Sequence, residues 1–259
     1  MQTVLFTSTI YGPITSRRLG SSLGINVMPS DGKICSFDCL YCEAGFNAQG
    51  PGSTGVPSRE HVKKLLSKKL QELQAEGKTI DSITFSGNGE PTLHPQFPQI
   101  IHDTINLRNR YFPQAKITVL SNATMAGRES VARALKLVDN NVLKLDSANA
   151  HTLRALNRPV SPNVLPEGII TDLAAFNGKC IVQTIMVRGN FNGETVDNTT
   201  PKEIAALIEA YRIIRPAEIM LYTIDRRTPA KDLEKISGDE MKRIAQEIEQ
   251  AGFKVQLTI

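Results

Sequence analysis

Short β-branched runs alternate with longer amphipathic segments along most of the 259-residue chain. Strands are predicted at 23–28, 82–86, 116–120, 142–146, 181–187, 217–222 and 254–258. Helices are predicted at 58–75, 95–108, 128–138, 165–176, 201–212 and 238–251, and Ser58 is the expected N-cap of the first. Because strands that alternate with helices form a parallel sheet, the sequence predicts an α/β fold.

No feature of the sequence divides the chain into separate domains. Hydrophobic residues make up 41% of it, enough for a large core, and no repeat, low-complexity tract or linker is present. We therefore expect one domain, residues 1–259. No apolar stretch approaches the roughly 20 residues that cross a bilayer, and the first residues lack the pattern of a secretory signal. The expected location is cytoplasmic, without membrane contact.

Unusual polar sequences follow several of the predicted strands. A cysteine-containing loop, about 31–50, follows the first strand, GNGEPT (87–92) the second and SNAT (121–124) the third. KLD (144–146) and YTIDRR (222–227) stand at the ends of two later strands. Since the carboxyl ends of parallel strands meet at one edge of a sheet or one mouth of a barrel, we expect these segments to converge there.

The cysteine loop contains Cys35, Cys39 and Cys42, three of the four cysteines in the chain. A structural zinc site normally has four Cys or His ligands. A cubane iron–sulfur cluster held by three thiolates instead leaves one iron open for a ligand, and the sequence favours such a [4Fe–4S] cluster. The alternatives are zinc with a distant fourth ligand, or three reduced thiols. Cys180, at the start of a predicted strand, is expected to be a buried core thiol.

The Cys-x3-Cys-x2-Cys spacing with Tyr41 inside it, followed by GNGEPT, resembles the radical S-adenosylmethionine (SAM) superfamily. YGPITSRRLGSSLGIN before the cysteines, and KLD, NRP, QTIMVRG and YTIDR after them, resemble the branch that includes the tRNA wyosine-base synthases. The resemblance runs from about Tyr11 to the end of the chain. It implies a partial (β/α)6 TIM-like barrel of the radical SAM type, with the cluster in the loop after the first strand.

The resemblance also implies a chemistry. The open iron would chelate the amino and carboxylate groups of the methionine moiety of SAM. An electron from the cluster, supplied by a donor such as flavodoxin or ferredoxin, would then break a carbon–sulfur bond. The products are methionine and a 5′-deoxyadenosyl radical, which abstracts a hydrogen atom from the substrate.

Within GNGEPT, the resemblance assigns cofactor-binding roles to four residues. Gly87 and Gly89 would let the backbone approach SAM, and the Glu90 carboxylate would pair with the methionine ammonium group. Asn88, which departs from the commoner GGEP form, adds a side-chain amide that would bond either the ligand or the backbone.

Further cofactor contacts are expected at the ends of other strands. Tyr41 matches the aromatic position whose backbone meets adenine. Ser121 and Asn122 would bond the ribose or the methionine carboxylate, or else cap the next helix. Lys144 and Asp146 lie two residues apart on a strand, so they face one side, where they would contact the ribose or a carboxylate or pair with each other. Gln183 and Arg188 are additional candidates.

Two arginine pairs, Arg17 with Arg18 and Arg226 with Arg227, are candidate substrate contacts. Guanidinium groups suit phosphate or carboxylate, which fits RNA, a phosphorylated small molecule or a carboxylate; structural ion pairs are the alternative. The net charge of +4 allows a nucleic-acid partner without requiring one. The wyosine synthases carry further N-terminal cysteines, and this chain has none before Cys35. Because its first predicted strand starts almost at once, we expect no RNA-binding extension and no direct transfer of the wyosine reaction.

Three functions remain open at this stage. The chain is either a radical SAM enzyme acting on RNA or a small molecule, an activase that installs a glycyl radical on a partner protein, or a non-catalytic metal-binding module. GNGEPT and the other polar segments at strand ends argue against the third, because a structural metal needs none of them.

Overall fold

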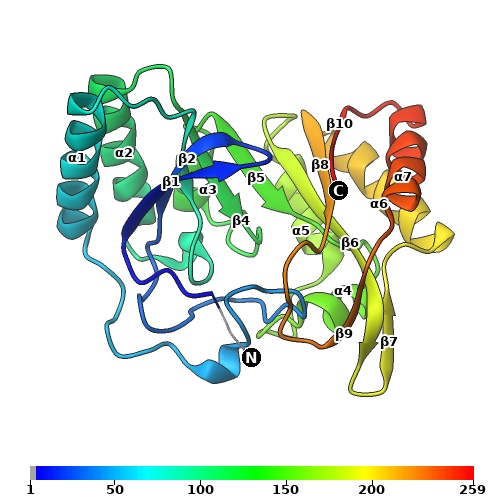
Figure 1. Cartoon of the computed structure of the whole chain (residues 1–259). Helices are drawn as coiled ribbons and strands as arrows, with labels where there is room; N and C mark the ends of the chain where they lie inside the picture. The colour runs from blue at the N-terminus through cyan, green and yellow to red at the C-terminus, as the bar shows by residue number, and fades with distance from the viewer. Residues whose placement is uncertain (1–3) are drawn as a thin grey trace.

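The computed structural model describes residues 4–259, which form a ten-stranded sheet with helices along its outer side (Figure 1). The strands are β1 (Ile10–Ser16), β2 (Gly20–Ile25), β3 (Ser82–Phe85), β4 (Lys116–Ser121), β5 (Asn140–Lys144), β6 (Ile181–Phe191), β7 (Glu194–Asp197), β8 (Glu218–Thr223), β9 (Asp232–Lys235) and β10 (Val255–Thr258). The helices are α1 (Arg59–Ala75), α2 (Phe97–Tyr111), α3 (Glu129–Leu135), α4 (Ala150–Asn157), α5 (Pro166–Ala174), α6 (Pro201–Ile214) and α7 (Gly238–Gln250), with 3-10 turns at Asn47–Gln49 and Pro91–Leu93.

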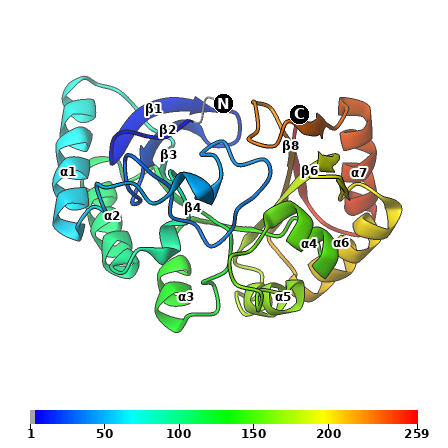
Figure 2. The same ribbon diagram turned by 90° about the horizontal axis from the view of Figure 1, so that it is seen from below.

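The main path of the sheet runs β1-β2-β3-β4-β5-β6-β8-β10. From β2 to β10 all neighbours are parallel, whereas β1 pairs antiparallel with β2. Seen from below, the helices form an arc outside the strands, and the long loop between β2 and α1 lies across the strand ends inside that arc (Figure 2). This mostly parallel, open α/β sheet matches a partial TIM barrel and confirms the predicted fold class. The predicted N-cap is also present, since the Ser58 hydroxyl accepts a hydrogen bond from His61 N.

Four elements were not expected from the sequence: β1, β7, β9 and α4. β1 contains Gly12 and Pro13, which are typical of turns rather than strands. The strands β7 and β9 are four residues each and pair only with the far half of β6. The first parallel strand also ends earlier than predicted, at Ile25, because the Asn26 side chain accepts from Met28 N and turns the chain.

The two faces of the barrel strands differ in polarity. Leu23, Ile83 and Ile117 are buried in the core cluster that also contains helix residues. Their neighbours face the other way and form a chain of hydroxyl contacts: Ser22 with Thr84 (2.7 Å), Ser82 with Thr84 (2.9 Å) and Ser82 with Thr118 (2.9 Å). The side chains therefore alternate between an apolar outer face under the helices and a polar interior.

The turn between β1 and β2 reaches the opposite edge of the sheet. Arg17 Nη1 donates to Ile259 O (3.0 Å), next to the end of β10, and Arg17 Nη2 lies 2.9 Å from an Asp225 carboxylate oxygen in the loop after β8. These contacts join the two edges of the open barrel. No helix within residues 4–259 is both long and apolar enough to cross a membrane.

Candidate active site

Main-chain hydrogen bonds attach the start of the cysteine loop to GNGEPT. Ile34 N donates to Asn88 O (3.1 Å), and Glu90 N donates to Ile34 O (3.0 Å). Between these two bonds, Gly89 has a φ of +139°, and a Cβ atom at this position would lie 1.8 Å from Ile34 O. Glycine is therefore required for the backbones to approach so closely, which fixes the loop against the segment that follows β3.

The end of α4 holds the other side of the same loop. Leu40 N donates to Leu156 O (3.0 Å), and Asp38 N donates to Asn157 O (2.9 Å). The cysteine loop is thus attached to the segments that follow β3 and β5, at the carboxyl ends of the parallel strands. This is the place that the sequence predicted for it.

The three clustered cysteines lie in this loop as free thiols, with Cys39 buried and Cys35 and Cys42 partly buried. Two asparagine amides contact their sulfur atoms: Asn157 Nδ2 lies 3.4 Å from Cys39 Sγ, and Asn122 Nδ2 lies 3.5 Å from Cys35 Sγ. Both contacts come from segments after other strands. They orient the sulfur atoms from outside the loop.

The electrostatic surroundings of these thiols fit a cationic metal group. Burial raises the pKa of Cys35, and the charges of Glu90 and Cys39 raise it further. Burial, followed by the charge of Cys42, raises the pKa of Cys39 to about 11. The charges of Lys33 and Lys144 oppose these shifts but do not outweigh them, and iron would supply further positive charge.

The donor set also fits a cluster better than it fits one ion. Within residues 4–259, no three His, Cys, Asp or Glu side chains converge closely enough to hold a single metal ion. Thiolates that hold a cubane cluster bind separate iron atoms, so they need not converge on one point. The fourth cysteine, Cys180, is 2% exposed in the main core cluster, as the sequence predicted.

Glu90 is buried and joins GNGEPT to SNAT. Its Oε1 accepts bonds from Thr92 N (3.0 Å), from the Thr92 hydroxyl and from Ser121 Oγ (2.8 Å). Its Oε2 accepts one bond, from Asn122 N (2.6 Å). Burial raises the pKa of Glu90, and these hydrogen bonds oppose the shift. Ser121 and Asn122, expected near the cofactor, are thus brought against Glu90 rather than capping a helix.

The Asn88 side chain bonds the backbone, one of the two roles expected for it. Its Nδ2 donates to Phe6 O (2.9 Å) and Pro29 O (2.8 Å), and its Oδ1 accepts from Phe6 N (2.8 Å). Asn88 is fully buried. It therefore fastens the N-terminal segment to GNGEPT.

Tyr41, Lys144 and Asp146 meet in the barrel interior. Asp146 Oδ2 accepts from the Tyr41 hydroxyl and from Asn157 Nδ2 (2.6 Å). Lys144 Nζ lies 3.7 Å from Asp146 Oδ1 and donates to the Tyr222 hydroxyl (3.0 Å). Burial disfavours the charged form of Lys144, but Asp146 and Tyr222 outweigh it and raise the pKa of the lysine. Lys144 and Asp146 do pair, and both face the interior.

The structure gives the four candidate substrate arginines different surroundings. Arg17 is paired with Asp225, and Arg226 Nη1 lies 2.6 Å from a Glu43 carboxylate oxygen in the cysteine loop. Arg227 lines a cavity of about 390 Å³ that reaches Cys42. The Arg18 guanidinium stacks on the Tyr222 ring, 4.6 Å from its centroid.

The two additional candidates also differ in position. Gln183 contacts Met220 Sδ (3.3 Å) inside the barrel. Arg188 donates to Thr199 and contacts Glu240, away from the cysteine loop.

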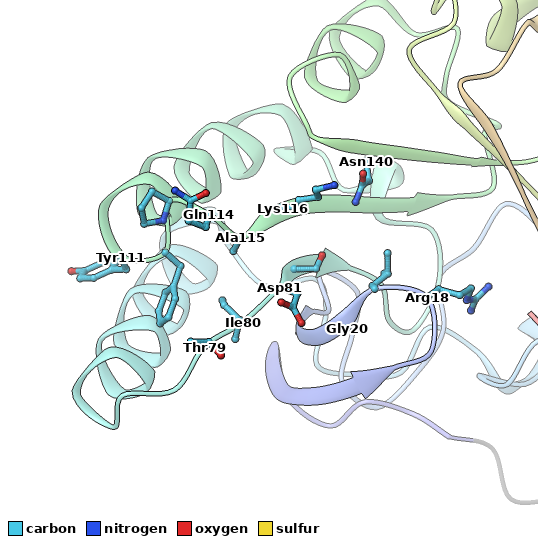
Figure 3. Close-up of a pocket in the computed structure, with 14 residues that line it drawn as sticks. Arg18, Gly20, Thr79, Ile80, Asp81, Tyr111, Gln114, Ala115, Lys116 and Asn140 are labelled. Atoms are coloured by element: carbon cyan, nitrogen blue, oxygen red, sulfur yellow. The ribbon is translucent and has the colours of Figure 1, made fainter. Parts of the chain in front are cut away.

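The larger cavity, of about 680 Å³, lies at the opposite end of the strands (Figure 3). It is lined by the starts of β3, β4 and β5, including Ser82, Lys116 and Asn140, and by Arg18 and Gly20 of the hairpin. It contains no cysteine. The chemistry of the cysteine loop therefore belongs to the other end of the barrel, although this cavity is larger.

Sequence reasoning missed two residues that organise the site. Asn157 contacts Cys39, Tyr41 and Asp146. The Lys33 side chain is 1% exposed, and its Nζ donates to Gly45 O (2.7 Å) across the cysteine loop. Asn157 belongs to the NRP sequence, so a signal was present, but only the fold brings it to the loop.

A family model for the radical SAM superfamily matches residues 30–199, which include the cysteine loop, GNGEPT, SNAT and KLD. The chain belongs to the radical SAM superfamily. Members use SAM and an iron–sulfur cluster for radical chemistry, so this radical SAM protein is an enzyme of that class.

Curated relatives share most of the chain. The UPF0026 protein of Synechocystis is 31% identical over 87% of this chain and 78% of its own length. The GTPase Obg of Brachyspira hyodysenteriae is 26% identical over 92% of this chain, which spans only 33% of the length of that relative.

Solved structures share the fold at lower identity. SuiB of Streptococcus suis bound to SAM has a TM-score of 0.64 and 15% identity over 91% of this chain and 50% of its own. TYW1 with a lysine–pyruvate adduct bound has a TM-score of 0.60 and 15% identity over 90% of this chain and 75% of its own.

The substitution Gly89→Ala tests the attachment of the cysteine loop. The added Cβ would overlap Ile34 O, and an L-residue is strained at a φ of +139°. We expect destabilisation of at least about 1–3 kcal/mol and a loss of iron uptake on anaerobic reconstitution, measured by colorimetric iron analysis. Gly193→Ala is the control, because Gly193 also has a positive φ (+83°) but faces open space. Wild-type iron uptake by Gly89→Ala would contradict this account.

The substitution Asn157→Leu tests the link between the loop and the barrel interior. It removes donors from Cys39 and Asp146 in a buried setting, which typically costs about 1–3 kcal/mol per unsatisfied group. Urea denaturation should show this loss in the free energy of unfolding. Asn163→Leu, on an exposed loop position, should change it little. If the two substitutions changed the free energy of unfolding equally, the contacts of Asn157 would not contribute to stability.

Proposed function

We propose that this protein holds one [4Fe–4S] cluster through Cys35, Cys39 and Cys42 and uses it to cleave SAM reductively. The resulting 5′-deoxyadenosyl radical abstracts a hydrogen atom from a substrate. The observation that carries the proposal is the position of the loop that contains the three thiols. This loop is attached to GNGEPT on one side and to the end of α4 on the other, at the carboxyl ends of the strands. When bound, the cluster supplies an electron and an iron that is open to SAM.

Glu90 is proposed to pair with the methionine ammonium group of SAM, and Gly87 and Gly89 to let the backbone approach this ligand. The Oε2 atom of Glu90 accepts one hydrogen bond from the described residues, so it keeps acceptor capacity for a second donor. Its Oε1 atom already accepts three bonds, which fix the carboxylate in place. Glu90 thus offers a preoriented oxygen beside the cysteine loop. The crystal structure of SuiB bound to SAM supports SAM binding by a protein of this fold.

The remaining cofactor contacts are proposed at the ends of β4 and β5. Asn122 lies between Cys35 and Glu90 and would orient the methionine carboxylate together with Ser121. Lys144 and Asp146 face the interior beside Cys39 and would contact the ribose or a carboxylate. Tyr41 would meet adenine through its backbone, because its hydroxyl is bonded to Asp146. Asn88 supports this site by holding the N-terminal segment.

The substrate is proposed to be an RNA base or a small molecule with a phosphate or carboxylate group. The electron donor would be a small redox protein such as flavodoxin or ferredoxin. We further propose that residues 1–259 act as one domain in the cytoplasm. The alternative of an activase for a glycyl-radical partner protein stays a hypothesis, since no contact in the structure favours it.

Uncoupled cleavage of SAM tests the proposed function. After anaerobic reconstitution, the wild type should bind about four irons per chain and form 5′-deoxyadenosine from SAM with dithionite, measured by liquid chromatography. Cys35→Ala, Cys39→Ala and Cys42→Ala should each abolish product formation, because each removes a ligand of the cluster. Cys180→Ala is the matched control and should retain both iron and cleavage, since Cys180 lies in the core.

Two results would contradict the proposed function. One is tight binding of a single zinc ion with no iron uptake under reducing conditions. The other is full SAM cleavage by a variant that lacks one of the three clustered cysteines.

A further inference from the structure

Arg18 is a partly buried cation that has no counter-charge among residues 4–259. It lies in the turn between β1 and β2, and Figure 3 shows its side chain extending away from Gly20 and Asp81. Its Nη1 atom is buried and has no hydrogen-bond partner among residues 4–259. No carboxylate in that part of the chain lies within 4.0 Å of it. Because a buried guanidinium nitrogen without a partner costs free energy, this position calls for an acceptor.

The surroundings of Arg18 add a second positive charge. Its guanidinium lies over the Tyr222 ring, and the Tyr222 hydroxyl accepts a hydrogen bond from Lys144 Nζ (3.0 Å). The one carboxylate beside Lys144, that of Asp146, also accepts bonds from Tyr41, Asn157 and Ile185 N. Arg18 and Lys144 thus both contact the Tyr222 side chain, and the Asp146 carboxylate beside Lys144 already accepts three other hydrogen bonds.

This part of the barrel interior contains polar side chains that are partly exposed. The Lys144 side chain is 14% exposed, and Arg18, Tyr41 and Tyr222 are all partly exposed. Tyr41 and Tyr222 also pack against a buried apolar cluster that includes Leu40 and Ile185. Arg18 and Lys144 lie 4.6 and 5.4 Å from the centroid of the Tyr222 ring, so a ligand bound to Arg18 would lie near both cations.

Two of the other candidate arginines, Arg17 and Arg226, do have a counter-charge. Arg17 is paired with Asp225 and Ile259 O, and Arg226 is paired with Glu43. Both are surface ion pairs, with at least half of the arginine side chain exposed. The arginine pairs of the sequence therefore divide into surface residues and one interior residue.

We infer that Arg18 binds a carboxylate or phosphate group of a small-molecule substrate inside the barrel, and that the charge of Lys144 on the other side of the shared Tyr222 contact favours this anion without binding it directly. A planar guanidinium held on an aromatic face is suited to both groups, which accept two parallel hydrogen bonds. That this anion belongs to the substrate rests on the proposed function. A small molecule is favoured over RNA because the unpartnered nitrogen is buried, whereas a nucleic-acid backbone would contact exposed cations.

Thermal denaturation in the presence of simple anions tests this inference on the full chain. Inorganic phosphate and succinate are titrated separately at constant ionic strength, with glycerol as the neutral probe. At least one anion should raise the Tm of the wild type, because a ligand that binds only the folded state stabilises it. The anion with the larger effect identifies the group that the site prefers.

Arg18→Met should weaken the binding of that anion by at least about tenfold, since a charge-assisted hydrogen bond is lost. Arg18→Lys keeps the charge but loses the planar fork and should be intermediate; it also keeps the test valid if Arg18→Met does not fold. Arg110→Met is the matched control, because Arg110 also stacks on a tyrosine ring, that of Tyr111, but on the exposed surface. It should bind the anion like the wild type.

Several results would overturn the inference. They are the absence of any anion effect on the wild type, equal anion binding by the Arg18 and Arg110 variants, or a loss of tRNA binding in Arg18→Met with no change toward phosphate and succinate. SAM affinity, measured by calorimetry, separates the two proposals. A selective loss of SAM affinity in Arg18→Met would assign Arg18 to the cofactor. This result would overturn the inference about Arg18 and leave the proposed function intact. Failure of the wild type to cleave SAM would overturn the proposed function, whatever the anions do.

Discussion

The contact between the Ile34 and Gly89 backbones determines where the cysteine loop lies. Without a side chain at Gly89, the loop can approach the segment after β3 and exchange two main-chain hydrogen bonds with it. The same segment carries Glu90, which binds Ser121 and the Asn122 amide after β4. One close approach of two backbones therefore aligns the loop with the ends of two neighbouring strands. The end of α4 then fixes the loop to the segment after β5.

Charge is distributed unevenly around this assembly. Cys39, Glu90 and Asp146 are buried near the loop and Cys35 is partly buried, and each would be negative when ionised. Burial and mutual repulsion raise the pKa of both thiols, so the site favours a ligand that brings positive charge. Lys144 supplies one cation beside Asp146, and Arg18 supplies a second over the Tyr222 ring. The interior thus changes from an anionic region at the cysteine loop to a cationic region at Lys144 and Arg18.

The sequence predicts the parts of this arrangement that depend on local pattern. Periodicity located the parallel strands and every helix except α4, and cysteine spacing located the loop, because both are properties of contiguous residues. It did not predict β1, whose Gly12 and Pro13 resemble a turn, or the different surroundings of Arg17 and Arg18. Those surroundings depend on Asp225, Tyr222 and Ile259, more than 200 residues away. Asn157 was missed for the same reason, since its contacts with Cys39 and Asp146 exist only in the folded chain.

The central claim is that three cysteine ligands leave one iron of the cluster open to SAM. Mössbauer spectroscopy of protein reconstituted with ⁵⁷Fe, recorded without and with saturating SAM, tests it most directly. The account predicts that about one iron in four changes its isomer shift and quadrupole splitting when SAM binds, while the other three keep their sulfur-coordinated parameters. A spectrum in which no iron responds to saturating SAM would contradict it.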